Sequence, residues 1–195
     1  MKEFVAGFDP GGQGNFGWCL AELTDPLNVI CQGTKNCADE AFDEIKKRLN
    51  DTNGRILAAG IDAPLYWTRQ GDSRESDVCV RRISGASSGT VQAVNSLRGA
   101  CLIQGFFLAT RIESEYPDCM ITETHPKALV AVSSEARKIV EIVEGVWNEH
   151  EADALISAWV AAQCLRHGGK QNLFECDKKE NIHTFLKKTM YWWPN

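Results

Sequence analysis

The sequence predicts one α/β domain in which helices flank a mixed sheet, built from an antiparallel three-stranded meander plus parallel strands. The first third of the chain holds three strand-like runs with turn residues, and no helical pattern, between them. Helical and strand-like patterns then alternate, as they do where helices connect parallel strands. A length of 195 residues is enough for one well-buried core and short for two full domains. We therefore expect a single domain over residues 1–195.

Turn residues delimit the three strands of the meander. A glycine-rich turn over 9–14 separates the first two strands, and Asp25-Pro26 separates the second from the third. The expected strands cover residues 3–8, 17–23 and 28–34.

A helix, a buried strand and an insertion are expected next. Apolar side chains recur at helical spacing over 38–49, and residues 55–61 form a nearly continuous apolar run, typical of a central strand covered on both faces. From 66 to 89 the composition becomes polar and rich in glycine and serine. This predicts a loop-rich insertion with a short helix near 73–83.

The second half of the chain is expected to be mainly helical. A largely buried helix over 90–115 leads to a short strand over 119–122, and further helices are expected over 126–132, 134–144 and 149–167. The tail over 170–195 mixes charged residues with Trp192-Trp193-Pro194 and is expected to form a short helix whose aromatic side chains dock on the body. Small residues in the last long helix would let it pack closely on the sheet: Ala154, Ser157, Ala158, Ala161 and Cys164.

The order of these elements favours one fold among the α/β architectures. Three strands in a meander, followed by alternating helices and strands, are the topology of the RNase H-like fold, whereas an ordinary doubly wound sheet would begin with strand, helix and strand. The fold class that we expect is therefore an RNase H-like mixed sheet flanked by helices.

Four carboxylates stand where an apolar run stops. Asp9 ends the first strand, Asp62 the fourth and Glu123 the fifth, while Asp153 interrupts the otherwise apolar last long helix. The carboxyl ends of neighbouring parallel strands meet at one edge of a sheet, where ligands of open α/β sheets usually bind. We therefore expect these side chains to converge.

Converging carboxylates stay ionised at neutral pH only if a cation lies between them, and Mg²⁺ or Mn²⁺ is the usual choice because both prefer oxygen ligands. Two such ions can bind the attacking water and the leaving oxygen of a phosphodiester. In this scheme Asp9 bridges the ions, Asp62 and Asp153 hold one ion each, and Glu123 is a ligand or a nearby base.

Each carboxylate also has a simpler explanation. Asp9 precedes Pro-Gly-Gly and fits a turn, and Asp62 precedes Ala-Pro, where a carboxylate can cap a loop. Glu123 and His125 could form a local hydrogen bond before Pro126. The charge of Asp153 lies among small residues and requires a partner. One shared metal site explains all four carboxylates better than four unrelated local roles do.

Histidine and arginine residues complete the expected site. His150 lies three residues before Asp153 and so on the same helix face, where it could activate water or bind metal; an exposed histidine at a helix start is the alternative. The stretch 78–112 contains four arginines and no acidic residue, within a chain of net charge −5. We expect the part from Arg81 to Arg98 to border the cleft, and Arg81, Arg82 and Arg98 to bind substrate phosphate together with His125, although pairing with distant carboxylates would also explain the arginines. The four are Arg81, Arg82, Arg98 and Arg111.

Four sequence segments resemble a widespread family of uncharacterised proteins described as predicted nucleases with an RNase H-like fold. The resemblance covers most of the chain, from about residue 2 to 165, and it implies the fold and a metal-dependent nuclease with Asp9, Asp62, Glu123 and Asp153 at matching positions. The His-x-x-Asp-Ala pattern of the last helix also looks like the Holliday-junction-resolvase branch of this superfamily. The segments are Gly7-Phe8-Asp9-Pro10-Gly11-Gly12 with Gly17-Trp18, Gly60-Ile61-Asp62-Ala63-Pro64-Leu65, Glu123-Thr124-His125-Pro126 and Glu151-Ala152-Asp153-Ala154-Leu155.

The functional hypothesis is metal-dependent phosphodiester hydrolysis on DNA or RNA. Two alternatives stay open: a noncatalytic binding module of the same fold, and an ATP- or phosphate-binding protein of the actin-like or sugar kinase type. The second alternative needs two such domains, and no Walker-type motif is present. Neither a signal peptide nor a run of about 20 apolar residues is found, so we expect a cytoplasmic protein without a membrane segment. The eight cysteines are scattered, without a C-x-x-C pair, and are expected to be mostly buried thiols.

Overall fold

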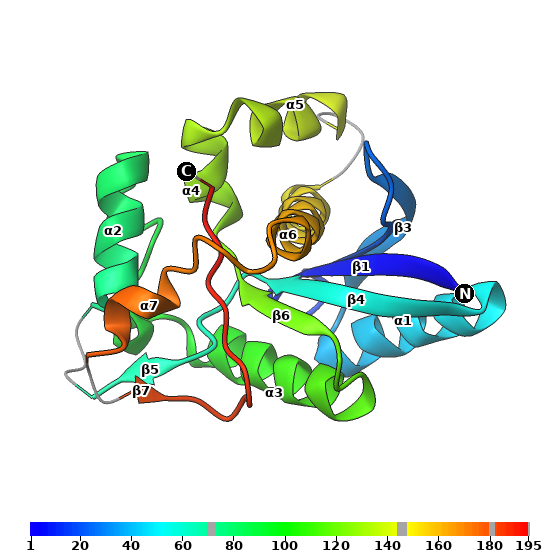
Figure 1. Cartoon of the computed structure of the whole chain (residues 1–195), viewed down its shortest axis with the longest axis horizontal. Coiled ribbons are helices and arrows are strands. Elements are labelled where there is room, and N and C mark those ends of the chain that lie inside the picture. The colour runs from blue at the N-terminus through cyan, green and yellow to red at the C-terminus, as the bar shows by residue number, and fades with distance from the viewer. Residues whose placement is uncertain (70–72, 144–147, 180–181, 195) are drawn as a thin grey trace.

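A five-stranded mixed sheet forms the centre of the protein (Figure 1). The computed structural model describes residues 1–69, 73–143, 148–179 and 182–194. The strand order is β3-β2-β1-β4-β6; β1 pairs antiparallel with β2, as β2 does with β3, while β4 lies parallel to both β1 and β6. The expected meander joined by parallel strands is confirmed. The strands are β1 (Lys2–Asp9), β2 (Phe16–Glu22), β3 (Asn28–Lys35), β4 (Gly54–Ile61) and β6 (Met120–Glu123).

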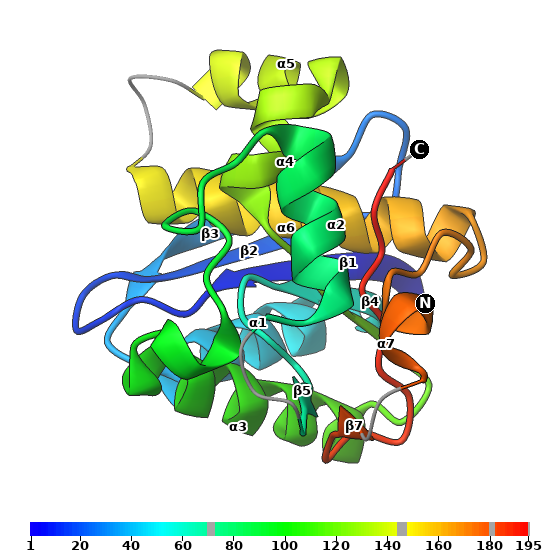
Figure 2. The ribbon, with the colours of Figure 1, turned by 90° about the vertical axis from the view of Figure 1, so that its left-hand side faces the viewer.

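Helices cover both faces of the sheet. Helices α1 (Ala38–Thr52) and α3 (Gly99–Glu115) lie against one face, and α6 (Glu149–Arg166) crosses the other (Figures 1 and 2). The alternation of side chains along each strand produces these two layers. In β1, for example, Phe4 and Phe8 join the core shared with α1 and α3, and Val5 joins the core shared with α6.

The remaining helices lie outside these layers (Figures 1 and 2). They are α2 (Glu75–Ser84), α4 (Pro126–Val132), α5 (Ser134–Val143) and the short α7 (Phe174–Asp177). Helices α2 and α7 lie at the end of the sheet where β1 and β4 finish, and α4 and α5 lie toward the side of α6 that faces away from the sheet. The last residue of the expected 134–144 helix lies outside the described residues.

Helix α6 rests directly on the sheet because glycines leave room for its backbone. A Cβ atom on Gly17 would lie 2.1 Å from the carbonyl oxygen of His150, and one on Gly60 would lie 2.1 Å from that of Ser157. His150 and Ser157 are about two helical turns apart and so lie on one face of α6. The close packing expected from the small residues of this helix is confirmed, and it gives α6 one fixed position across β2, β1 and β4.

The expected helix over 90–115 is too long at its beginning. Helix α3 starts only at Gly99, and it is preceded by extended backbone around a short 3-10 turn, Val94–Ser96. Val91 and Val94 are buried at a spacing that also fits an α-helix, but Val91 lies in a loop and Val94 begins the 3-10 turn. The carbonyl of Val91 accepts a hydrogen bond from Nη1 of Arg81 (2.9 Å), so a side chain provides a partner that a helix would have provided from its backbone.

The C-terminal tail docks on the body, as expected. Residues Tyr191, Trp192 and Trp193 are buried in a core shared with α4 and α6, and α7 is the short helix of this segment. The tail runs beside β6, where the backbone N–H of Glu123 donates to the carbonyl of Met190 (2.9 Å). It also pairs with the insertion through β5 (Trp67–Thr68) and β7 (Ile182–His183). Residues 70–72 of the insertion and 180–181 and 195 of the tail lie outside the described residues.

Two further observations concern the whole chain. All eight cysteines are free thiols, but only Cys19 and Cys164 are buried, so the expectation that most are buried is wrong. Among the described residues, no helix has both the length and the apolar character that crossing a membrane requires.

Candidate functional site

Three of the four carboxylates come together where β1 and β4 end beneath α6. Asp9 is the last residue of β1, and Asp62 directly follows β4. The backbone N–H of Asp62 donates to the carbonyl of Phe8 (2.9 Å), so the parallel pairing of the strands continues to this point. Asp153 lies on α6, next to the residue whose backbone contacts Gly7 of β1.

Strand alternation explains why these aspartates share one face. Phe8 and Ile61 are paired across β1 and β4, and both are buried on the side of α1 and α3. The following residues, Asp9 and Asp62, therefore point toward α6. The sheet and the helix thus place the three carboxyl groups in one space.

The pKa values of Asp62 and Asp153 show that these carboxylates lie close together. Burial and the charges of Asp9 and Asp153 raise the pKa of Asp62 well above its ordinary value. Burial and the charge of Asp9 raise the pKa of Asp153 to about 7. The side chains of Asp9, Asp62 and Asp153 are 14%, 21% and 10% exposed, so the group is enclosed yet open to water. A cation between them would relieve the repulsion, and the all-oxygen donor set fits a hard divalent ion.

His150 contacts Asp9 directly. Its Nδ1 lies 2.6 Å from Oδ2 of Asp9, and its Nε2 lies 3.9 Å from Oε1 of Glu149. Burial raises the pKa of Asp9, while the hydrogen bond and the charge of His150 oppose the shift. His150 therefore lies inside the site, with one ring nitrogen oriented by Asp9 and the other directed away from it.

Lys127 is a member of the site that sequence reasoning missed. It is the second residue of α4, and its Nζ lies 3.7 Å from Oδ2 of Asp153 and 3.6 Å from Oε2 of Glu149. Burial would lower its pKa, but the surrounding carboxylates, Asp153 first, raise it. A signal was available: Lys127 follows Pro126 in the first turn after β6, at the same edge of the sheet as the aspartates.

Glu123 does not join the three aspartates. It is paired with Ile61 in the register of β6 and β4, and it therefore points to the face opposite Asp62. The side chain is fully buried, and its two oxygens accept hydrogen bonds from Nη1 (2.8 Å) and Nη2 (2.5 Å) of Arg74. Burial alone would raise the pKa of Glu123, but the charge of Arg74 and the nearby His125 lower it. We therefore leave Glu123 out of the proposed ligand set.

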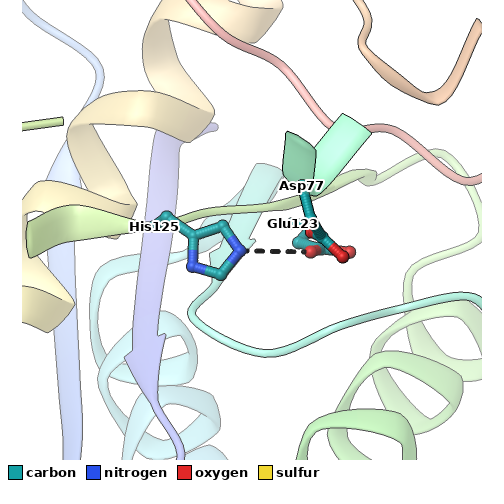
Figure 3. Close-up of side chains that lie close together, drawn as sticks. All are labelled: Asp77, Glu123 and His125. Carbon is teal, nitrogen blue, oxygen red and sulfur yellow. Dashed lines mark ion pairs between the residues drawn. The ribbon is translucent and has the colours of Figure 1, made fainter. Parts of the chain in front are cut away.

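His125 stands between the two groups. Its Nδ1 lies 3.8 Å from Oδ1 of Asp62, and its Nε2 lies 3.6 Å from Oε1 of Glu123 (Figure 3). The ring packs near Tyr191 of the tail, with 5.6 Å between ring centroids. His125 thus approaches Asp62 from the side of Glu123.

Asp77, Glu123 and His125 also approach one another closely enough to hold a metal ion, with ligand atoms within 4.8 Å (Figure 3). Arg74, however, already provides positive charge there. Its Nε and Nη2 donate to Asp77 at 2.9 and 2.6 Å, and its Nη1 and Nη2 donate to Glu123. One guanidinium thus pairs with both carboxylates, and we assign this cluster to the ion pair rather than to a metal. No sequence pattern marked Arg74, which lies in the polar insertion.

The arginines have different surroundings. Arg98 directly precedes α3, and the pKa of nearby Cys101, raised mainly by burial, also responds to the charges of Asp9, Arg98 and Asp62. Cys101 therefore lies within reach of these charges, and the role of Arg98 as a substrate-binding residue stays a prediction. Arg82 donates to Sγ of Cys79 (3.6 Å), while Arg111 pairs with Asp43 (2.6 Å) and with Asp39, which is the alternative that the sequence left open. Within the described residues, no contact of Arg81 or Arg82 with the three aspartates is found, and their role as substrate-binding residues stays a prediction.

Comparison with protein-family models and with curated proteins finds no match. Functional inference for this chain therefore rests on its own residues.

Proposed function

We propose that this protein is a metal-dependent phosphodiesterase with an RNase H-like fold, acting on DNA or RNA with Mg²⁺ or Mn²⁺ held by Asp9, Asp62 and Asp153. One observation carries the proposal: Asp9 at the end of β1, Asp62 just after β4 and Asp153 on α6 lie close enough that Asp9 raises the pKa of the other two and Asp153 raises that of Asp62. Lys127 offsets only part of the repulsion among these carboxylates, and a bound divalent ion would offset more of it.

The topology supports the choice of fold. The order β3-β2-β1-β4-β6, with an antiparallel meander on one side and parallel strands on the other, follows the strand arrangement inferred from the sequence. Helix α6 crosses the face to which Asp9 and Asp62 point, and it contributes the third carboxylate. The family resemblance of the four sequence segments points to the same assignment.

The protein's own residues have distinct tasks in this scheme. Asp9, Asp62 and Asp153 would hold the ion or ions, which when bound polarise the phosphate and activate water. His150, oriented by Asp9, can accept a proton from the attacking water at Nε2. Lys127 supplies positive charge at the border of the site, where the phosphate of a nucleic acid would lie, and we propose that Arg98 binds this phosphate as well.

The test compares wild type with Asp9→Asn. Removing one ligand charge should weaken Mn²⁺ binding and reduce Mn²⁺-dependent cleavage by orders of magnitude, while the melting temperature stays unchanged or rises as repulsion is relieved. Asp51→Asn is the matched control, because this exposed aspartate near the end of α1 lies beside the start of β4, at the opposite end of the sheet.

The measurements are a Mn²⁺ titration and an assay on single-stranded, duplex and branched DNA and RNA. Cleavage that survives in Asp9→Asn or in EDTA would contradict the proposal. Mn²⁺ binding without any cleavage would favour the noncatalytic binding module.

A further inference from the structure

A series of buried polar side chains connects α2 to Asp62, and Glu123 is at its centre. Besides the two hydrogen bonds from Arg74, Glu123 accepts one from the backbone N–H of Leu65 (3.0 Å). Leu65 is three residues beyond Asp62, so Glu123 ties the loop that carries Asp62 to the end of β6. With three donors on two oxygens, the Glu123 carboxylate has one orientation.

Arg74 is held as firmly on its other side. It donates to Asp77 and to the carbonyl of Tyr66 (3.2 Å), and its guanidinium stacks 4.3 Å from the centroid of the Tyr66 ring. The tail completes this enclosure: Asp177 accepts hydrogen bonds from the Tyr66 hydroxyl (2.6 Å) and from the backbone N–H of Glu75 (2.7 Å). The insertion and the tail thus hold Arg74 in place.

His125 links Glu123 to Asp62, because its ring lies between the two carboxylates. Nε2 lies 3.6 Å from Oε1 of Glu123, and the other ring nitrogen, Nδ1, lies 3.8 Å from Oδ1 of Asp62. Both separations are slightly longer than a hydrogen bond, so the imidazole fills the space between the two carboxylates. The Nε2 atom of His125 is buried and has no hydrogen-bond partner within 3.5 Å among the described residues, so a movement of a few tenths of an ångström toward Glu123 would complete the bond. Carboxylate ligands of metals are commonly oriented by such outer partners.

Stability is a poor explanation for this arrangement. Burying two carboxylates and a guanidinium costs several kcal/mol per ion, and well-packed apolar side chains often replace such a cluster without loss. A positioning role explains why the charges lie directly beside the site.

We infer that Arg74, Glu123 and His125 act as positioning residues that hold the Asp62 carboxylate in the orientation that binds the metal ion. This inference rests on the proposed function, because it takes Asp62 as a metal ligand. It assigns a task to the insertion and the tail, which contribute Arg74 and enclose it.

The experiment is a double-mutant cycle with Mn²⁺ as the probe. We measure the Mn²⁺ dissociation constant from the spin-resonance signal of the free ion for wild type, His125→Asn, Asp62→Asn and the double variant. His125→Asn should weaken binding by about tenfold or more in the wild-type background. It should have no further effect in the Asp62→Asn background, where Asp9 and Asp153 remain to hold the ion.

One control and one further test variant accompany the cycle. His183→Asn changes an exposed histidine in β7 and should leave the Mn²⁺ dissociation constant unchanged. Glu123→Gln removes the charge that orients His125, and its effect should not add to that of His125→Asn; if this variant fails to fold, the His125 cycle decides alone.

The outcomes separate the two proposals. A wild-type protein that binds no Mn²⁺ overturns the proposed function and this inference with it. Normal wild-type binding with no loss in His125→Asn, or with the same loss in both backgrounds, overturns only the positioning role.

Discussion

Asp153 is the residue at which burial and charge oppose each other most clearly. It lies on a helix among alanines, and its carboxyl group is close to Asp9, which has the same charge. Its contact with Lys127 offsets only part of the free-energy cost of burying an ionised Asp153 beside Asp9, because the lysine side chain is 61% exposed. The folded protein therefore holds a proton on Asp153 at pH values where the unfolded chain has released it.

The first prediction concerns the dependence of stability on pH. The pKa of Asp153 is raised from 3.8 in the unfolded chain to about 7 in the folded protein. The protonated carboxyl group therefore contributes fully to the free energy of unfolding below about pH 4, and this contribution is lost as pH rises through 7. Metal-free wild type should lose of the order of a few kcal/mol of unfolding free energy over this range. Urea unfolding at a series of pH values should show a shallower slope for Asp153→Asn. An unchanged slope would mean that Asp153 is ionised throughout.

A second prediction concerns Lys127, whose ammonium group lies where positive charge is needed before an ion binds. Lys127→Met should tighten Mn²⁺ binding by about threefold to tenfold, because the ion no longer meets a like charge, and it should slow cleavage, because a phosphate partner is lost. Lys47→Met, an exposed lysine on α1, is the control. Weaker Mn²⁺ binding in Lys127→Met would show that the lysine supports the ligands instead of competing with the ion.

At the scale of elements, the position of α6 determines the geometry of the site. The helix carries both His150 and Asp153, and it meets the sheet through backbone contacts at glycines rather than through flexible side chains. Such a contact cannot adapt to an added atom without a shift of the whole helix.

We therefore predict a double effect of Gly60→Ala. The new methyl group would lie 2.1 Å from the carbonyl oxygen of Ser157, so α6 must move, at a cost of about 1–3 kcal/mol in unfolding free energy. Mn²⁺ affinity should fall as well, because Asp153 moves with the helix. Gly99→Ala, where an added Cβ meets open space, should change neither quantity. The measurements are urea unfolding and the Mn²⁺ titration. A destabilised Gly60→Ala variant with normal Mn²⁺ affinity would show that metal binding does not depend on the position of α6.

At the scale of the whole molecule, the tail is part of the core. Trp192 is 3% exposed, packs against Trp159 and His167, and donates its backbone N–H to the hydroxyl oxygen of Thr122 in β6. Residues from the end of the chain thereby cover the edge of the sheet that β6 would otherwise leave open.

Trp192→Ala should accordingly destabilise the protein by about 3–5 kcal/mol. Trp67→Ala makes the same chemical change at a tryptophan that is 44% exposed, and it should cost much less. Denaturant unfolding of the two variants provides the comparison. Equal, small losses would show that the tail can leave the body without unfolding it.

The strands, most helices and three of the four carboxylates could be predicted because their signals are local. Apolar periodicity and turn residues mark elements such as β1 and α6, and Asp9 and Asp62 follow directly from strand ends. The beginning of α3 could not be predicted, because a loop that buries Val91 and Val94 reproduces helical spacing.

The sequence by itself determined the order of the elements and the presence of acidic residues at the ends of strands. Only the tertiary structure decided which of them meet. The register that pairs Ile61 with Glu123 turned this glutamate to the opposite face, and it brought Arg74 to a carboxylate 49 residues away. Lys127 joined the site in the same way, through the packing of α4 beside α6. Periodicity within a segment reveals which face of that segment is apolar; the register between strands and the partner of a buried charge depend on contacts between distant segments, and no local pattern records them.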